Sequence, residues 1–368
     1  MTPMSIVNRL SSALTVTRAF VDARRGQRPP LYLVHALTAR CNARCGFCAW
    51  NPDFYDPQDQ LSTDAIKQLY TDARAAGFIG LSVWGGEPLL HRDFDEIIRH
   101  ARAVGLLTHM VTNGFLLEHK MDAVVRDMDR VCISLDHPSE RHDELRGIQG
   151  LYARIVSATK TLRARAPGKQ IIFVCTLQKA NVAPPTLRRL AELMGSLGVL
   201  GTFNGLREEA AADGGDADIH AYAASQAQLA VAFSTLRDLK RQGFPILNSY
   251  THLDMMRAGP PEYRCHWPKF MLPIEANGDV VDCMHWGRRP VGNLRQTPLA
   301  ELLAHPRLRA LAGAEGEACH RCVSIHRVEI SEVCDGNLEP LRAWAMLRKP
   351  PRPRQPIGPE DAASQVRA

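Results

Sequence analysis

The spacing of apolar residues changes in a regular alternation along the first two thirds of the chain. Short apolar runs, typical of buried strands, are each followed by a segment with apolar residues three or four positions apart, typical of an amphipathic helix. The expected strands are 31–37, 81–84, 107–111, 131–135, 171–177 and 199–206, and the expected helices are 63–75, 93–104, 121–128, 151–164, 184–197 and 220–242. This alternation predicts a parallel α/β sheet covered by helices, and periodicity alone leaves a doubly wound sheet and a partial TIM-like barrel open.

The two ends of the chain differ from this central part. Residues 1–30 carry apolar side chains at near-helical spacing, which predicts an N-terminal amphipathic helix. A basic amphipathic helix can lie on a membrane surface, but this stripe lacks Trp, which favours packing against the rest of the protein. The tail 349–368 is rich in proline and poor in apolar residues, so we expect it to be disordered.

The pattern changes again near residue 243. The apolar segments 271–275 and 280–284 flank Asn277 and Gly278, a dipeptide typical of hairpin turns, and 298–311 has helical spacing. We therefore expect two domains, a larger one at 31–242 and a small α+β domain with a hairpin at 243–348.

Composition narrows the class of protein. The chain has 368 residues, of which 45% are hydrophobic and 23% charged, values that are typical of a globular protein. No run of 18 apolar residues and no secretory signal is present, so we expect a cytoplasmic protein, with membrane contact limited to the N-terminal helix. The net charge of +6 permits a nucleic-acid partner, but no RNA-binding module is recognisable in the sequence. We therefore expect no nucleic-acid partner.

Cysteine usage carries the first chemical information. Three of the ten cysteines lie between 41 and 48 and five between 265 and 334, while Cys132 and Cys175 lie inside predicted strands as small core residues. Clustered cysteines in an intracellular protein favour metal binding or redox chemistry. Cys41, Cys45 and Cys48 follow the first strand in a loop where they can converge; three ligands favour an iron–sulfur cluster with one open iron, because zinc sites usually have four.

The Cys-x3-Cys-x2-Cys spacing, with Phe47 before the last cysteine, resembles the signature of the radical S-adenosylmethionine (SAM) superfamily. Further motifs in the same order end later strands: Trp-Gly-Gly-Glu-Pro at 84–88, Thr-Asn-Gly at 112–114, Ser-Leu-Asp at 134–136, and an Arg-Gly pair at 146–147. The resemblance covers about 31–242 and implies a partial (β/α)6 TIM-like barrel. It implies that SAM contacts come from Phe47, Gly85, Gly86, Glu87, Thr112, Asn113, Ser134, Asp136 and Arg146.

The resemblance also implies a reaction. The open iron of a [4Fe–4S] cluster would bind SAM, and one electron from a donor such as flavodoxin or ferredoxin would cleave it to methionine and a 5′-deoxyadenosyl radical. That radical would abstract hydrogen from a substrate, while the protein supplies orientation and excludes competing reactions.

The second cysteine group resembles a SPASM domain, or its shorter form, Twitch. Cys265, Cys283, Cys319 and Cys322 fit the Twitch pattern, which implies one auxiliary [4Fe–4S] cluster. Cys334 departs from the pattern, and three roles remain open for it: a replacement ligand, a structural thiol or a hydrogen-atom donor. Catalytic residues stay unassigned, with Asp282 beside a cluster ligand and Glu208 after the sixth strand as further candidates.

The single auxiliary cluster favours a small-molecule or natural-product substrate that is dehydrogenated or epimerised, with the auxiliary cluster as electron acceptor. One alternative is a ribosomal-peptide maturase that forms crosslinks or thioethers. Another is a lipid-modifying enzyme at a membrane surface. A non-catalytic metal-binding protein is the alternative from another class, and it would leave the Gly-Gly-Glu-Pro and Ser-Leu-Asp elements without a function.

Overall fold

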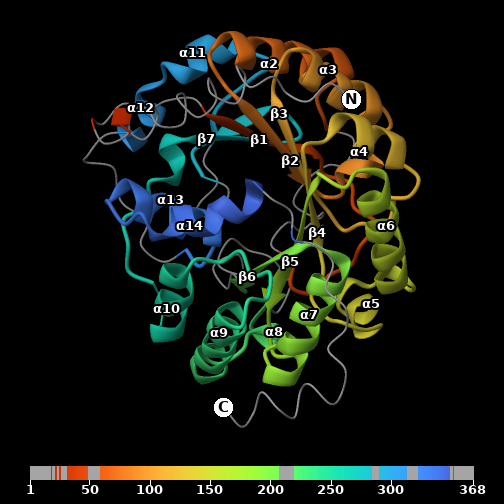
Figure 1. Cartoon of the computed structure of the whole chain (residues 1–368). Coiled ribbons are helices and arrows are strands. Elements are labelled where there is room, and N and C mark those ends of the chain that lie inside the picture. Colours follow the sequence, from red (N-terminus) through yellow and green to blue (C-terminus); the bar gives the residue numbers. More distant parts are fainter. Residues whose placement is uncertain are drawn as a thin grey trace.

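The computed structural model in Figure 1 describes residues 18, 21–22, 25, 31–48, 59–206, 219–259, 261–283, 290–312, 322–348 and 351. The expected N-terminal helix and tail lie almost wholly outside these residues. Among the described helices, none is both long enough and apolar enough to cross a lipid bilayer.

One nine-stranded sheet organises the described chain, in the order β6-β5-β4-β3-β2-β1-β7-β8-β9. Its strands are β1 (Tyr32–Thr38), β2 (Gly80–Gly85), β3 (Leu107–Thr112), β4 (Arg130–Ser134), β5 (Gln170–Leu177), β6 (Leu200–Gly205), β7 (Met271–Ile274), β8 (Asp279–Val281) and β9 (Pro290–Asn293). The first six pair in parallel as a curved, partly closed barrel, which confirms the predicted (β/α)6 architecture (Figure 1).

The expected hairpin is present and extends the barrel sheet. β7 pairs in parallel with β1, with His35 opposite Ile274, and β8 then runs antiparallel to β7. β9, which the sequence did not predict, pairs antiparallel with β8. The small C-terminal unit is therefore joined to the barrel through main-chain hydrogen bonds.

Helices cover the outer face of the sheet (Figure 1). Those that follow the barrel strands are α2 (Thr63–Ala75), α3 (Phe94–Ala103), α4 (Met121–Asp127), α5 (Arg141–Arg146), α6 (Leu151–Arg165), α7 (Pro184–Leu197), α8 (Ile219–Tyr222) and α9 (Gln226–Arg241). The remaining helices are α10 (Tyr250–Ala258), α11 (Leu299–Leu303), α12 (Pro306–Ala312), α13 (Ile325–Cys334) and α14 (Glu339–Trp344), with short 3-10 turns η2 (Pro88–Leu90), η4 (Trp267–Lys269) and η5 (Ala345–Arg348).

Two predicted helices are divided in the structure, so those predictions were wrong in extent. The segment 220–242 splits because Ser225 caps a new helix: its side chain accepts from the Gln228 backbone N–H, and the Gln228 side chain accepts from the Ser225 N–H. The segment 298–311 splits at Pro306, which starts α12 because it lacks a backbone N–H to continue α11.

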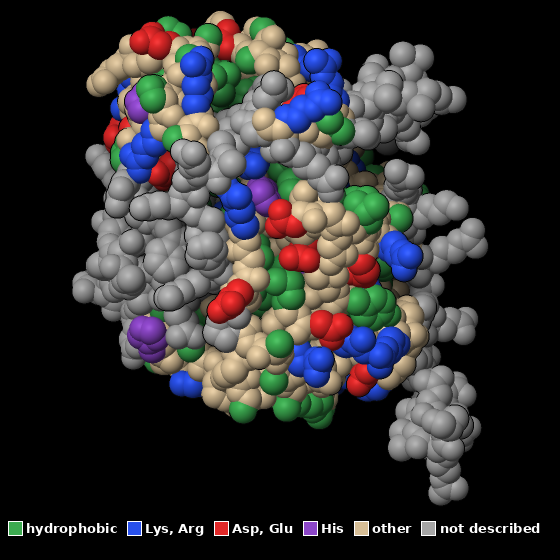
Figure 2. Space-filling model, turned by 90° about the vertical axis from the view of Figure 1, so that its left-hand side faces the viewer, with side chains coloured by type: hydrophobic (Ala, Val, Ile, Leu, Met, Phe, Trp, Pro, Cys, Tyr) green, Lys and Arg blue, Asp and Glu red, His purple; other side chains and the backbone are tan. Residues whose placement is uncertain are grey.

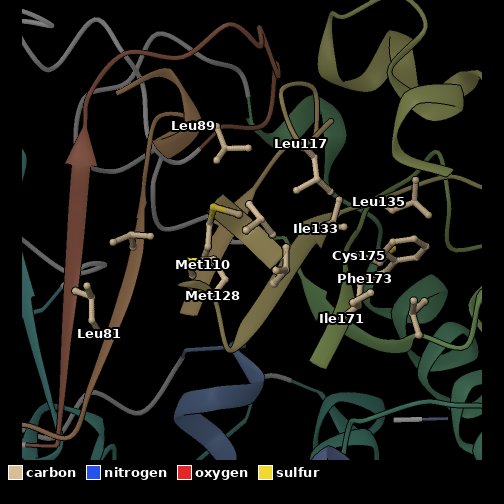
Figure 3. Packing of buried hydrophobic residues seen from close by; sticks show 14 of the residues in the cluster. Leu81, Leu89, Met110, Leu117, Met128, Ile133, Leu135, Ile171, Phe173 and Cys175 are labelled. Atoms are coloured by element: carbon tan, nitrogen blue, oxygen red, sulfur yellow. The ribbon is translucent and has the colours of Figure 1, made fainter. Parts of the chain in front are cut away.

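The main hydrophobic core lies between the strands and the helices outside them. Figure 3 shows part of it, where side chains from β2 to β5 meet residues of the following loops; the labelled side chains are Leu81, Leu89, Met110, Leu117, Met128, Ile133, Leu135, Ile171, Phe173 and Cys175. Cys175 is fully buried there, as expected of a small core residue.

The C-terminal helices occupy the inside of the curved sheet. In Figure 1, α13 and α14 lie between its β7 and β6 ends. The backbone N–H of Ile325, at the start of α13, donates to Asn204 Oδ1 near the end of β6 (3.0 Å). At the other end of α13, Cys334 packs against Leu31 and Phe270, which precede β1 and β7. α13 therefore runs from the carboxyl ends of the strands to their amino ends.

Candidate active site

The loop after β1 carries the first three cysteines and is held by local hydrogen bonds. The Cys41 sulfur accepts from the Ala43 N–H (3.4 Å), and the Cys48 N–H donates to the Cys45 carbonyl (3.1 Å). Burial raises the pKa of the Cys41 thiol, and the nearby charges of Glu87 and Cys45 raise it further. The structure thus brings this loop together with the loop after β2.

Two glycines allow the loop after β2 to approach so closely. The Gly86 N–H donates to the Thr38 carbonyl (2.9 Å), and the Glu87 N–H donates to the Arg40 carbonyl (2.8 Å). Gly85 has a φ of +118°, and a Cβ there would lie 2.5 Å from the Thr38 oxygen. A Cβ on Gly86 would lie 2.2 Å from the Arg40 oxygen. Glycine is therefore required at both positions.

The Glu87 carboxylate is completely buried and joins the ends of β2 and β3. It accepts hydrogen bonds from Thr112 Oγ1 (2.7 Å), the Asn113 N–H (2.7 Å) and the Leu89 N–H (3.1 Å). Asn113 in turn donates through Nδ2 to Asn42 Oδ1 in the cysteine loop (2.8 Å). Burial outweighs these hydrogen bonds and raises the pKa of Glu87 to about 7.

Asp136 and Arg146 form a second polar group beside the same cysteine loop. Arg146 Nε donates to Asp136 Oδ2 at 2.7 Å, and the other carboxylate oxygen accepts from the Thr176 N–H at 2.9 Å. The guanidinium lies 5.1 Å from the Phe47 ring centre, and its Nη1 donates to the Cys45 sulfur at 3.8 Å. Arg146 is thereby fixed against the loop.

The second group of cysteines also converges. Burial raises the pKa of Cys265 to about 12, while the charges of Cys283 and Cys322 add to this rise, so the three thiols are neighbours. The Tyr263 hydroxyl donates to the Cys322 carbonyl (2.8 Å) and ties the two segments together. Cys319 lies outside the described residues.

Comparison with known families decides the identity. The model of the radical SAM superfamily matches residues 36–177, and that of the SPASM iron–sulfur cluster-binding domain matches residues 265–323. Residues 36–177 therefore form a radical SAM domain. The chain is a radical SAM enzyme that uses SAM and a [4Fe–4S] cluster, and its SPASM domain binds auxiliary iron–sulfur.

Two characterised radical SAM relatives span most of the chain. The pre-heme d1 synthase of Dinoroseobacter shibae is 25% identical over 370 residues, covering 89% of this chain and 85% of that protein. The PqqA peptide cyclase of Methylocella silvestris is 27% identical over 310 residues, covering 80% of each.

Solved structures share the fold at low sequence identity. SuiB of Streptococcus suis bound to SAM superposes with a TM-score of 0.63 at 17% identity, over 79% of this chain and 72% of that chain. The enzyme anSMEcpe with bound SAM gives a TM-score of 0.58 at 14% identity, over 87% and 98% of the two chains. Both support the barrel with its C-terminal extension.

The residues of the radical SAM site fit the polar groups of SAM. The donors to Glu87 among the described residues are uncharged, so its buried carboxylate can still accept from an ammonium group. Arg146 has further N–H groups beyond those directed at Asp136 and Cys45, which suit a carboxylate. Ser134 is the last residue of β4 and lies two residues before Asp136.

The cysteines fit a cluster rather than one ion. Within the described residues, no three His, Cys, Asp or Glu side chains are grouped so that they could hold a single metal ion. A [4Fe–4S] cluster does not require such convergence, because each cysteine binds a different iron. Cys265, Cys283 and Cys322 are near enough for their charges to affect one another, as the ligands of one cluster would be.

Cys334 is remote from Cys322 but close to the segment that carries Cys265, because the neighbouring Asp335 Oδ1 lies 2.8 Å from His266 Nε2. Cys334 is separated from Cys322 by α13, a helix of ten residues that spans about 15 Å. Its side chain is buried near Leu31, Ile79 and Phe270, at the amino ends of the strands. Since the radical SAM site lies at the opposite ends, this placement gives no support to a role of Cys334 as hydrogen-atom donor, while the roles of replacement ligand and structural thiol both stay open.

Asp282 is held in an ion pair on the outside of the hairpin. Its Oδ2 lies 2.5 Å from Arg307 Nη2 on α12, and its side chain is only 14% exposed. Such a pairing is typical of a structural carboxylate and gives no support to a catalytic role. Glu208, the other acidic candidate, lies outside the described residues.

Two residues near the site were missed from the sequence. Tyr222 covers the cysteine loop, with its ring 5.9 Å from that of Phe47 and its hydroxyl in the space that a Cβ on Gly46 would fill. Glu275 follows β7 and is buried, with neither carboxylate oxygen hydrogen-bonded within the described part of the chain. Burial raises the pKa of Glu275 to about 8. Only its position before the Asn277-Gly278 turn marked Glu275 in the sequence.

Proposed function

We propose that this radical SAM enzyme oxidatively modifies a peptide, using one auxiliary cluster held by Cys265, Cys283, Cys319 and Cys322. When bound, SAM and the first cluster supply the radical that removes a hydrogen atom from the substrate, and the auxiliary cluster supplies a site for the electron that the substrate then loses. The enzyme class is established by the family, whereas the peptide substrate and the number of auxiliary clusters are parts of this proposal.

One observation carries the proposal: the first cysteine group and the hairpin that leads to Cys283 start from adjacent strands, β1 and β7, of one sheet. The first group follows β1, and β7, which pairs directly with β1, leads into the hairpin that carries Cys283. Ala276, after β7, packs in one cluster with Cys48 and Trp84 of the radical SAM site. A shared sheet supports hydrogen abstraction at one group and electron uptake at the other.

The relatives bear on the substrate class. The sequence favoured a small-molecule or natural-product substrate, with peptide maturation as an alternative, and the PqqA peptide cyclase favours that alternative. SuiB has been crystallised with its precursor peptide SuiA, but its low identity extends only the fold to this chain. A second candidate, formation of a haem-like compound, is supported by the 25% identity to pre-heme d1 synthase over 89% of the chain.

The described surface in Figure 2 gives no support to a nucleic acid as substrate. On the face shown in Figure 2, the described Lys and Arg side chains are interspersed with Asp and Glu and form no continuous basic stripe. Such a stripe is typical of surfaces that track phosphates.

The protein's own contribution is orientation. Glu87 would accept from the SAM ammonium, and Arg146 would donate to the SAM carboxylate, because both are buried and already aligned by neighbours. Asp136 holds the Arg146 guanidinium through its Nε and is itself held by the Thr176 N–H. Such alignment before binding lowers the entropic cost of reaching a reactive geometry.

The ligand assignment is tested by anaerobic reconstitution and iron analysis. We expect about eight irons per chain in the wild type, and about four in the triple variant Cys41→Ala/Cys45→Ala/Cys48→Ala and in Cys265→Ala/Cys283→Ala. SAM cleavage to 5′-deoxyadenosine should be lost in the triple variant. Cys132→Ala, which removes a thiol outside both groups, serves as the matched control and should keep all the iron. About twelve irons in the wild type would overturn the assignment of one auxiliary cluster.

The substrate class is tested with the reconstituted enzyme, SAM and two candidate sets: short peptides encoded beside the gene, and haem precursors. A peptide substrate should increase 5′-deoxyadenosine formation and lose two hydrogen atoms by mass spectrometry. Stimulation by a haem precursor and by no peptide would reject the peptide and support the second candidate.

A further inference from the structure

Arg327, in the first turn of α13, is a buried cation that lacks an acidic partner in the described structure. Its side chain is only 5% exposed, and its Nε and Nη2 have no hydrogen-bond partner among the described residues. Burying an uncompensated charge costs several kcal/mol, so such a group is expected to face an anion. Its position is fixed by Trp267, since the guanidinium carbon lies 4.4 Å from the centre of the indole ring.

The surroundings of Arg327 identify where that anion lies. Arg327 lies over Trp267, which is two residues from Cys265, and it stands on the helix that begins three residues after Cys322. The charge of Arg327 acts on Cys265 directly, opposing the rise that burial causes in the pKa of that thiol. No described ion pair neutralises Arg327.

We propose that Arg327 is a positioning residue for the auxiliary cluster, and that its positive charge raises the reduction potential of that cluster. The inference rests on the proposed function, because it takes Cys265, Cys283 and Cys322 as cluster ligands. It assigns to this chain a residue that favours electron uptake at the SPASM site.

The physical reason is electrostatic. A [4Fe–4S] cluster with four thiolate ligands carries a net negative charge, which increases by one when an electron enters. A nearby positive charge therefore stabilises the reduced form more than the oxidised form, and the effect is larger in a buried site, where water does not screen it. The aromatic contact keeps the guanidinium in place without supplying a competing negative charge.

The test compares three variants of the full-length reconstituted enzyme. Arg327→Met keeps much of the side-chain shape and removes the charge, Arg327→Lys keeps the charge, and Arg342→Met removes an arginine from the exposed face of α14 as the matched control. The midpoint potentials are measured by redox titration monitored by electron paramagnetic resonance. The signal of the auxiliary cluster is assigned in the chain that lacks the first three cysteines.

We expect Arg327→Met to shift the auxiliary potential to more negative values and to leave the potential of the radical SAM cluster unchanged. Arg327→Lys should restore most of the shift, and Arg342→Met should match the wild type. An unchanged auxiliary potential in Arg327→Met, with full iron content, would overturn the inference while leaving the proposed function intact.

The iron contents of the Arg327 variants also test the inference. If Arg327→Met loses the auxiliary iron and Arg327→Lys retains it, the charge is needed to hold the anionic cluster, which supports the inference. If both lose it, the residue serves the fold rather than the charge, and the inference is overturned. If Cys265→Ala/Cys283→Ala keeps all the iron of the wild type, the proposed ligand set fails, and the role of Arg327 fails with it.

Discussion

Replacing Glu275 with glutamine should stabilise the protein, and increasingly so as the pH rises. The Glu275 side chain is 4% exposed, and both of its carboxylate oxygens lack a partner in the described structure. Burial raises its pKa from 4.5 to about 8. At about 1.4 kcal/mol for each pH unit, that difference corresponds to at most roughly 5 kcal/mol of unfolding free energy.

The sign follows from where the proton is bound. Between pH 4.5 and about 8, the folded protein retains the Glu275 proton that the unfolded chain releases. Raising the pH through this range therefore lowers the free energy of unfolding. Glu275 causes no loss of stability only below the pKa of the unfolded chain, where both states hold the proton. Glutamine carries no titrating proton, so Glu275→Gln should equal the wild type near the lower end and be several kcal/mol more stable near the upper end.

The measurement is urea unfolding of the iron-free, full-length chain at several pH values between about 5 and 8. Glu301→Gln, which neutralises an exposed glutamate on α11, is the matched control and should change stability by about 0.5 kcal/mol or less at every pH. If the Glu275→Gln and wild-type stabilities ran parallel across the whole range, the carboxylate would not be buried and unpaired as described, and the reasoning would be refuted.

Two further substitutions test the site itself. Gly86→Ala should abolish SAM cleavage while retaining the auxiliary iron, because its Cβ would lie 2.2 Å from the Arg40 oxygen. The control Gly168→Ala, whose Cβ would meet no atom within 4 Å, should leave SAM cleavage unchanged. Equal SAM cleavage by both variants would contradict the close approach of the two loops. Asp282→Asn should retain the iron and lower the unfolding free energy, measured by urea unfolding, by about 1 kcal/mol, because the ion pair with Arg307 is lost. An unfolding free energy equal to that of the wild type would show that this ion pair contributes little to stability.

The alternation of strands and helices was readable from the sequence because each element's hydrophobic period is a local property. The cysteine spacing and the Gly-Gly-Glu-Pro loop were readable for a related reason: their chemistry depends on residues that are close in the chain. The divided helices were the local failures. Ser225 and Pro306 interrupt helices by capping and by a missing N–H, signals that apolar spacing does not contain.

Tertiary structure alone decided how the motif residues are used. The sequence offered Asp282 and Cys334 as functional candidates, but α12 supplies an ion-pair partner to the first, and the course of α13 carries the second away from Cys322. Conversely, no motif in the sequence marked Arg327, and only its position before the hairpin turn marked Glu275. The character of both residues comes from burial without a described partner. Local spacing in the sequence specifies the helices, the strands and the cysteine motif. Packing decides which charged side chains are buried without an ion-pair or hydrogen-bond partner, because burial and such contacts depend on segments that are distant in the chain.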